Sequence, residues 1–280
     1  MSRITWIVVV SIAVAALLGV VLLCAGPSDE PSYQGRPLHS WLEDIKGLRF
    51  RCETGRGLEL EVTNVAVSAV LAIGPQALPW LCRELRARES SLKVKIRATI
   101  SFRYLRPFWS LIGPPDHPTL WERHRRAGVG VLVLGDVALA ALPELAANLK
   151  SGDDCSLYTW SLVRMGRAGV PVLAASVTNE ATRFISLAAL EATGASTEPA
   201  VPALLNVLTN GNGFPSIQGA FRNARGASNM IVPVLEGVMS SPKFTVAESA
   251  KETLKVMRRT SDPEIKFTLD VDRYGNFGAR

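Results

Sequence analysis

The sequence predicts an all-α protein, an α-solenoid preceded by one transmembrane helix. Three observations lead to this prediction. A phrase of roughly thirty residues returns several times along the chain, which is the mark of a repeat architecture. Each copy reads as two apolar helices joined at a glycine. An uncharged stretch, Ile4–Ala25, precedes the repeats, and hydrophobic residues make up 48% of the 280-residue chain, too many for a disordered protein.

The uncharged stretch Ile4–Ala25 is long enough for a membrane anchor, because a helix of this length reaches about 33 Å. A signal peptide usually has a shorter apolar region of about 7–15 residues. A cleaved signal, or one lipidated at Cys24, stays open as an alternative. Arg3 precedes the stretch, and Asp29 and Glu30 follow it. The positive-inside rule then predicts a single-pass membrane protein with a cytoplasmic N-terminus and a periplasmic or otherwise extracytoplasmic repeat domain.

The first helix of each repeat is predicted from residues that recur at fixed distances before a glycine. Small residues let neighbouring helices approach closely, and glycine suits the chain reversal after a last helical turn. The glycines are Gly74, Gly135, Gly166 and Gly194. The small residues, five places earlier, are Ala69, Gly130, Ser161 and Ala189, and each is followed by a larger apolar residue: Val70, Val131, Leu162 and Leu190.

The second helix of each repeat is predicted from a proline that fits a first helical turn and an apolar stripe around it. The prolines are Pro79, Pro143, Pro171, Pro202 and Pro233. Three successive intervals are 28, 31 and 31 residues, but the first is 64. Inside that interval only a poor copy of the phrase occurs, Leu111–Leu120, so the middle unit is either degenerate or an insertion.

These helix pairs resemble HEAT repeats, in the short form typical of bacterial HEAT-like proteins. The resemblance covers roughly Val65 to Arg259 and implies a right-handed superhelix of helix pairs that binds other proteins. The arginine that often opens a second HEAT helix occurs only at Arg126 and Arg183, which puts the repeat count in question.

The segment before the repeats resembles a short motif found between the anchor and the repeats of membrane-anchored bacterial HEAT proteins. Its residues here are Tyr33, Gly35, Arg36, Trp41 and Leu42. An apolar helix face with helical spacing follows, made of Leu38, Trp41, Leu42 and Ile45. We expect this face to cap the end of the solenoid, and a ligand site that uses Trp41 is the alternative.

The predicted organisation is an anchor or uncleaved signal (1–26), a linker (27–37), a capping helix and connection (38–64), a HEAT-like repeat domain (65–259) with a degenerate unit or insertion near 88–125, and a C-terminal tail (260–280). Over half of the residues after Arg36 should be helical, with essentially no β-sheet beyond one strand at the tail. Asp270, Asp272 and Gly275 match only the start of a calcium-binding loop, so the tail is expected to fray.

One segment is strongly basic. From Arg83 to Arg126 the chain has eleven Lys or Arg and four acids, a net charge of +7, with interleaved aromatic residues. It is either a solvated outer face or a docking surface for an acidic protein, a polyanion or an anionic headgroup, while the extracytoplasmic location disfavours nucleic acid. The candidate partner-binding residues are Arg97, Arg103, Arg106, Trp109, Trp121, Arg123, Arg125 and Arg126.

No catalytic, metal-binding or cofactor-binding motif is recognisable, including around His39, His117 and His124, so no cofactor is expected. Cys52 and Cys82 either pair or pack as thiols. We expect a non-enzymatic interaction scaffold with an unidentified protein partner. Two alternatives stay open: an enzyme with its site on the concave face, since some HEAT-like families resemble chromophore lyases or remove damaged DNA bases, and a structural envelope component that binds a polyanion.

Overall fold

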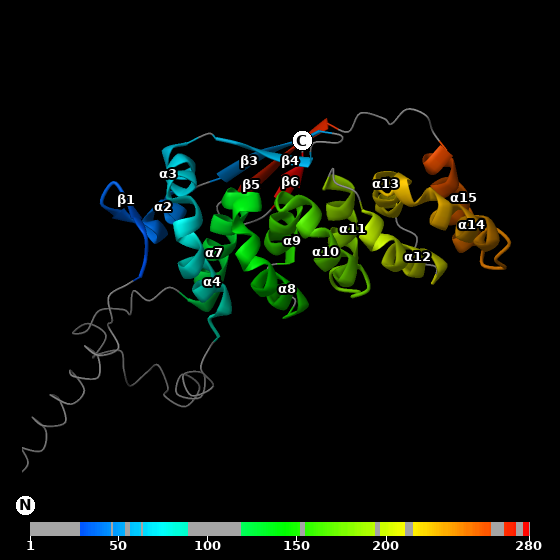
Figure 1. The fold of residues 1–280 in the computed structure, drawn as a ribbon, viewed down its shortest axis with the longest axis horizontal. Helices are drawn as coiled ribbons and strands as arrows, with labels where there is room; N and C mark the ends of the chain where they lie inside the picture. The colour runs from blue at the N-terminus through cyan, green and yellow to red at the C-terminus, as the bar shows by residue number, and fades with distance from the viewer. Residues whose placement is uncertain are drawn as a thin grey trace, which may run out of the picture.

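The computed structural model describes residues 29–45, 47–53, 57–62, 64–88, 119–151, 155–193, 197–210, 215–258, 266–272 and 277–279. The described chain is mostly helical, as predicted, and its helices stack side by side in two layers (Figure 1). The predicted anchor, Ile4–Ala25, and the candidate residues Arg97, Arg103, Arg106 and Trp109 lie outside the described residues.

The two layers alternate along the sequence, because successive helices belong to opposite layers. Each helix also contacts the next member of its own layer. The first layer contains α3 (Val65–Ile73), α7 (Leu120–Leu134), α9 (Cys155–Arg164), α11 (Arg183–Ala192), α13 (Pro215–Asn223) and α15 (Phe244–Arg258). The second layer contains α4 (Leu78–Arg86), α8 (Leu142–Ser151), α10 (Val170–Val177), α12 (Val201–Thr209) and α14 (Ser228–Val238).

Short 3-10 turns join the two helices of each pair. They are η1 (Gly74–Ala77), η2 (Gly135–Ala141), η3 (Gly166–Ala168), η4 (Glu198–Ala200) and η5 (Arg225–Ala227). Gly74, Gly135 and Gly166 have φ values of 56°, 60° and 58°, which residues with a Cβ rarely adopt. The glycines of the repeated phrase therefore reverse the chain between the layers, whereas Gly194 lies outside the described residues.

The prolines of the repeated phrase do not all take the same helical position. Pro79, Pro171 and Pro202 stand in the first turn of their helices, where the missing N–H costs no hydrogen bond. Pro233 lies inside α14, because that helix already begins at Ser228.

The small residues of the first layer are buried where neighbouring helices meet. Ala69 and Ala189 are 1% and 0% exposed, and Leu162 and Leu190 are both fully buried, as the repeat pattern predicts. Gly130 shows why a small residue is needed, because a Cβ there would lie 2.7 Å from Cδ2 of Leu81 on α4.

Helices α4 and α7 are far apart in sequence but pack directly against each other. The Arg123 guanidinium binds the Glu84 carboxylate, and the Asn148 side chain of α8 donates a hydrogen bond to the Leu85 carbonyl at 3.0 Å. His124 is 2.9 Å from the Ala87 carbonyl. The pairs α3–α4 and α7–α8 are therefore neighbours in the stack, with no helix pair between them.

A hairpin and a short helix close the N-terminal end of the stack. The elements are β1 (Ser32–Tyr33), β2 (Arg36–Pro37) and α2 (Leu38–Asp44). Helix α2 contacts α3 and α7 through the apolar face that the sequence predicts. Its residues Leu38, Trp41, Leu42 and Ile45 are 0–7% exposed.

The prediction of essentially no β-sheet is wrong. Four antiparallel strands form a sheet in the order β4-β3-β5-β6, and it lies over the first layer beside α9 (Figure 1). The strands are β3 (Gly47–Glu53), β4 (Gly57–Glu61), β5 (Lys266–Asp272) and β6 (Phe277–Ala279). Thus part of the expected connection and part of the expected frayed tail are strands, and the register pairs Asp270 with Arg49 rather than opening a calcium loop.

The sheet joins the stack through an apolar face and one arginine. Leu48, Phe50 and Leu58 are 0–4% exposed. Arg164 of α9 donates a hydrogen bond to the Leu58 carbonyl at 2.7 Å and lies 5.9 Å from the Phe50 ring. Burial lowers the pKa of Arg164, while the charges of Asp136 and Glu59 raise it.

The C-terminal end of the stack carries several charged side chains, although Phe244 at the start of α15 is 78% exposed. The exposed side of α15 carries Lys251 and Lys255, which pair with Glu248 and Glu252. Arg258 pairs with Glu236 of α14 at 2.8 Å. A repeat array needs a polar surface at its last unit, so these charges finish the stack.

Candidate interaction surfaces

The Tyr33–Leu42 motif has a structural role. Gln34 and Gly35 have φ values of 51° and 75°, the left-handed turn that joins two short strands tightly. The Trp41 indole donates a hydrogen bond to the Tyr33 carbonyl at 3.3 Å, and the Arg36 guanidinium lies 4.1 Å from the centre of the Trp41 ring. Because Trp41 is only 7% exposed, it packs in the cap and presents no open ligand site.

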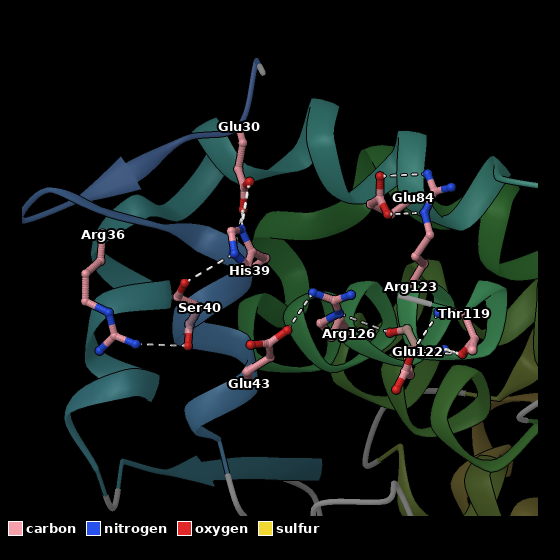
Figure 2. Close-up of polar contacts among 10 residues, drawn as sticks. All are labelled: Glu30, Arg36, His39, Ser40, Glu43, Glu84, Thr119, Glu122, Arg123 and Arg126. Atoms are coloured by element: carbon pink, nitrogen blue, oxygen red, sulfur yellow. Dashed lines mark hydrogen bonds and ion pairs between the residues drawn. The ribbon is translucent and has the colours of Figure 1, made fainter. Parts of the chain in front are cut away.

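The two described histidines make local contacts. His39 Nδ1 is 2.9 Å from the Glu30 carboxylate, whose Oε1 also accepts the His39 backbone N–H (Figure 2). His124 is buried against the Ala87 carbonyl. Among the residues that the structure describes, no three His, Cys, Asp or Glu side chains gather as metal ligands would.

Cys82 is a buried free thiol, 7% exposed, rather than half of a disulfide with Cys52. Burial raises its pKa, the Glu144 charge raises it further, and Arg86 lowers it. A thiol with a raised pKa is a weak nucleophile at neutral pH. Cys82 therefore packs in the core as a thiol.

Two of the candidate docking arginines are held by carboxylates. Arg123 binds both oxygens of Glu84 at 2.6 and 3.0 Å, which raises the pKa of the guanidinium (Figure 2). Arg126 pairs with Glu43 of α2 at 2.8 Å, and its side chain is only 8% exposed. We therefore remove Arg126 from the candidate docking surface, because a buried arginine that joins α7 to the cap cannot also meet a partner.

Two other candidates remain at the surface. Trp121 is 47% exposed in the first turn of α7, and the Arg125 guanidinium lies 5.8 Å from the centre of its ring. Thr119 and Glu122 form a reciprocal capping box that starts this helix (Figure 2). Hydrogen bonds from the backbone and side chain of Thr119 lower the pKa of Glu122. This turn is thus anchored locally where the chain returns to the stack.

Carboxylates from other parts of the chain pair with many of the described arginines of the basic segment, Arg83 to Arg126. Besides Arg123 and Arg126, Arg86 binds Glu144 at 2.6 Å and Arg83 lies 3.8 Å from Asp29. Counting charges along the segment misses Asp29, Glu43 and Glu144, because they come from other parts of the chain. Most of the remaining positive charge belongs to residues 89–118, where five Lys or Arg minus two acids give +3.

A second surface, which the sequence reasoning missed, runs along the second layer. We call it the proline face: the exposed side of α8, α10, α12 and α14. Its exposed residues include Pro143, Ala147, Pro171, Ala175, Pro202, Asn206, Pro233 and Gly237, together with the charged Lys150 and Glu236. Within windows 140–150, 168–178, 199–209 and 230–240, three of 44 residues are charged, against 20% in the whole chain. This scarcity of charged residues could have been noticed in the sequence alone.

One acid in the first layer has a perturbed pKa. Glu191 of α11 lies beside Gly219 of α13, and burial raises its pKa while Arg222, 4.0 Å away, lowers it. An acid of this kind can serve in general acid catalysis, but such chemistry also needs a second positioned group. The pair instead links two neighbouring helices of the stack.

No family model, curated protein or solved structure matches this chain. Among the described residues, two helical stretches are long and apolar enough to cross a membrane, Val65–Arg86 and Leu120–Lys150. The apolar windows of these stretches are 56% and 61% buried inside the stack, and each stretch spans a positive-φ glycine between its two helices. Core helices of a folded domain have these properties too.

Proposed function

We propose that this chain is a non-enzymatic interaction scaffold: an α-solenoid of HEAT-like helix pairs, held at a membrane on the extracytoplasmic side, that docks a protein partner through residues 89–118 and the adjoining Trp121 and Arg125. The observation that carries the proposal is the direct packing of α4 against α7 and α8. The stack is continuous without the segment between them.

The solenoid interpretation draws support from the two-layer packing. Helices of each layer stack on their neighbours, and the repeated glycines and buried small residues occupy equivalent places in successive pairs. Helix α2 covers one end, and the charged side of α15 finishes the other. A finished array with two unlike ends is what a solenoid needs in order to stay soluble.

A docking role for residues 89–118 draws support from their composition. They combine the net charge of +3 with Phe102, Tyr104, Phe108 and Trp109. Aromatic and arginine side chains contribute most to binding at protein interfaces, and positive charge steers an acidic partner. An insertion between the units of a repeat array is also a common place for binding.

The membrane tether draws support from the short distance between the apolar stretch and the cap. Only residues 26–28 separate Ala25 from Asp29, where the described chain begins. Three residues span at most about 11 Å when extended. A transmembrane Ile4–Ala25 would hold the N-terminal end of the stack, and with it Arg83 beside Asp29, close to the bilayer.

The test is capture of partners by the full chain from detergent-solubilised membranes. One variant replaces residues 89–118 with about eight Gly and Ser residues, which reach about 16 Å. A second variant changes the five cations of the segment to Gln: Lys93, Lys95, Arg97, Arg103 and Arg106. A matched control changes three exposed lysines elsewhere to Gln: Lys243, Lys251 and Lys255.

We expect the wild-type chain and the control to capture the same proteins at low salt, and both segment variants to lose them with little change in melting temperature. Raised salt should weaken capture, because exposed charges are screened beyond about 8 Å at physiological ionic strength. Capture that persists without the segment would contradict the proposed site. Binding of heparin, used as a model polyanion, in the absence of protein capture would favour the envelope alternative.

A further inference from the structure

Exposed aromatic side chains lie along one edge of the stack. Among the Trp and Phe side chains that the structure describes, three are exposed: Trp121 at 47%, Phe184 at 64% and Phe244 at 78%. Each stands in the first turn of a first-layer helix, namely α7, α11 and α15. We call this set the aromatic edge. Phe184 and Phe244 belong to neither the core nor the docking surface proposed above.

These three helices begin on the same edge of the stack. The first-layer helices before α15 lead into the 3-10 turns, and neighbouring turns contact each other, η1 with η2 and η4 with η5. Gly135, where α7 ends, lies beside the side chain of Arg164, where α9 ends. Arg225 of η5 donates a hydrogen bond to the Val256 carbonyl near the end of α15. The aromatic edge is therefore opposite the edge that carries the turns.

The described chain also begins at the aromatic edge. Helix α4 ends where α7 begins, because the Ala87 carbonyl is 2.9 Å from His124. Asp29 lies 3.8 Å from Arg83 in the last turn of α4. Three residues separate Asp29 from the apolar stretch Ile4–Ala25, and they span at most about 11 Å. In Figure 1 the blue N-terminal trace ends below α2, whereas the sheet lies above the stack.

We propose that the aromatic edge lies on the surface of the bilayer that holds the chain, with Phe184 and Phe244 in the lipid headgroup layer. The inference rests on the membrane tether of the proposed function, because a transmembrane Ile4–Ala25 puts this edge next to the bilayer. Aromatic side chains are favoured at the boundary between lipid and water. Trp121 lies nearer the tether, so the proposed docking surface adjoins the membrane.

The tether makes a small contact surface sufficient. Two phenylalanine rings would bind a free protein to lipid only weakly, since stable attachment to a membrane usually takes more than one weak signal. A short link to the anchor makes the contact intramolecular, at an effective concentration of about millimolar. Because α11 and α15 follow α7 along the stack, contact at both holds the stack along the membrane and not upright on its N-terminal cap.

The charges along the edge do not select anionic lipid. Exposed charges of both signs lie at the helix ends and loops of this edge, among them Arg88, Lys150, Lys243, Glu122 and Glu180. Zwitterionic headgroups carry both signs and can rearrange around each charge, whereas a protein partner would need a fixed opposite charge at each place. Neutral lipid should therefore suffice for the contact.

The test is photo-crosslinking of the full chain in vesicles of phosphatidylcholine alone, which has no net charge to attract residues 89–118. Benzoylphenylalanine replaces Phe184 or Phe244. The matched controls carry it at Val137 or Leu139, which are 45% and 47% exposed in η2 at the opposite edge. We expect about fivefold or more attached lipid at the two edge positions than at the controls, because only the edge reaches the headgroup layer.

A second variant tests whether the phenylalanines hold the edge on the lipid together. Phe184→Ser should lower the lipid attached from position 244 several-fold, whereas Val137→Ser should leave it unchanged. Both residues are exposed, so neither change should unfold the stack, and circular dichroism checks that the helices remain. Unchanged labelling from position 244 in Phe184→Ser would contradict a shared contact.

Equal labelling at the edge and at η2 would overturn the proposal. If alkaline carbonate extracts the full chain from the vesicles, the tether is wrong, and this inference fails together with the proposed function. If the chain stays embedded but Phe184 and Phe244 positions attach protein in native membranes and no lipid in vesicles, only this inference fails. Replacing residues 89–118 with Gly and Ser should leave lipid labelling intact, so loss of partner capture and loss of membrane contact are separate results.

Discussion

The direct stacking of α4 on α7 predicts a specific coupling between Gly130 and Leu81. A Cβ on Gly130 would lie 2.7 Å from Leu81 Cδ2 and 3.2 Å from Cδ1, both too close for a carbon contact. Leu81 is fully buried, so it has little room to move. Gly130→Ala should overpack this site at a cost of about 1–3 kcal/mol.

A second effect opposes the clash. Alanine is better than glycine inside a helix by about 1 kcal/mol, and Gly130 lies within α7. The net cost of Gly130→Ala should therefore be about 0–2 kcal/mol. Leu81→Ala alone leaves a cavity and should cost about 2–5 kcal/mol.

The double variant separates the two effects. Once Leu81 is alanine, the new methyl of Gly130→Ala meets no obstacle there, and only the gain of about 1 kcal/mol in helix propensity remains. The substitution should change from destabilising to stabilising. The coupling between the two positions is then about 1–3 kcal/mol, well above the few tenths expected of independent sites.

The assay is urea unfolding of the full chain followed by circular dichroism. The free energies of unfolding are compared among the wild type, the two single variants and the double variant, all with the same dependence on urea concentration. Gly128→Ala is the control, because a Cβ there would meet Leu157 of α9 at 2.5 Å and not Leu81. Additive changes for Gly130 and Leu81, within about 0.5 kcal/mol, would refute the direct contact. A helix pair would then have to stand between α4 and α7.

Ala189→Leu should destabilise the stack by about 1–3 kcal/mol, measured by urea unfolding, because Ala189 is fully buried between first-layer helices. Thr119→Ala should cost about 0.5–2 kcal/mol through the lost cap. The contribution of Glu122, whose pKa the cap holds below its usual range, is present above that range and should be lost as the pH falls through the lowered pKa, as a pH series of unfolding curves would show. Arg164→Met should speed hydrogen exchange in β4, because the Leu58 carbonyl loses its donor. Cys82 should resist a thiol reagent until urea unfolds the chain, because burial raises its pKa; rapid labelling of the native chain would contradict that environment.

The sequence alone determined the helical architecture and much of its packing. The spacing of Ala69, Gly130 and Ala189 before their glycines predicted residues that are now seen buried between helices. The apolar face of α2, including Trp41, was readable for the same reason. These patterns are local, since helix periodicity and turn chemistry depend on residues within a few positions of one another.

Two strands of the sheet could have been predicted from the sequence, but they were missed. Leu48–Cys52 and Leu58–Val62 alternate apolar and polar residues, which is the pattern of a strand with one buried face. What the pattern could not supply is the partner, because β3 pairs with β5 more than two hundred residues away. Strand pairing at such separation is decided by the fold that brings the two segments together.

The candidate sites depended most on tertiary structure. Arg126 and Arg123 read as exposed positive charge in the sequence, yet Glu43 and Glu84 bind them from α2 and α4. The proline face emerged only when equivalent positions of four helices were seen on one exposed side. Local sequence sets which residues share a helix face, but only the stacking of helices decides which face water reaches and which charges meet.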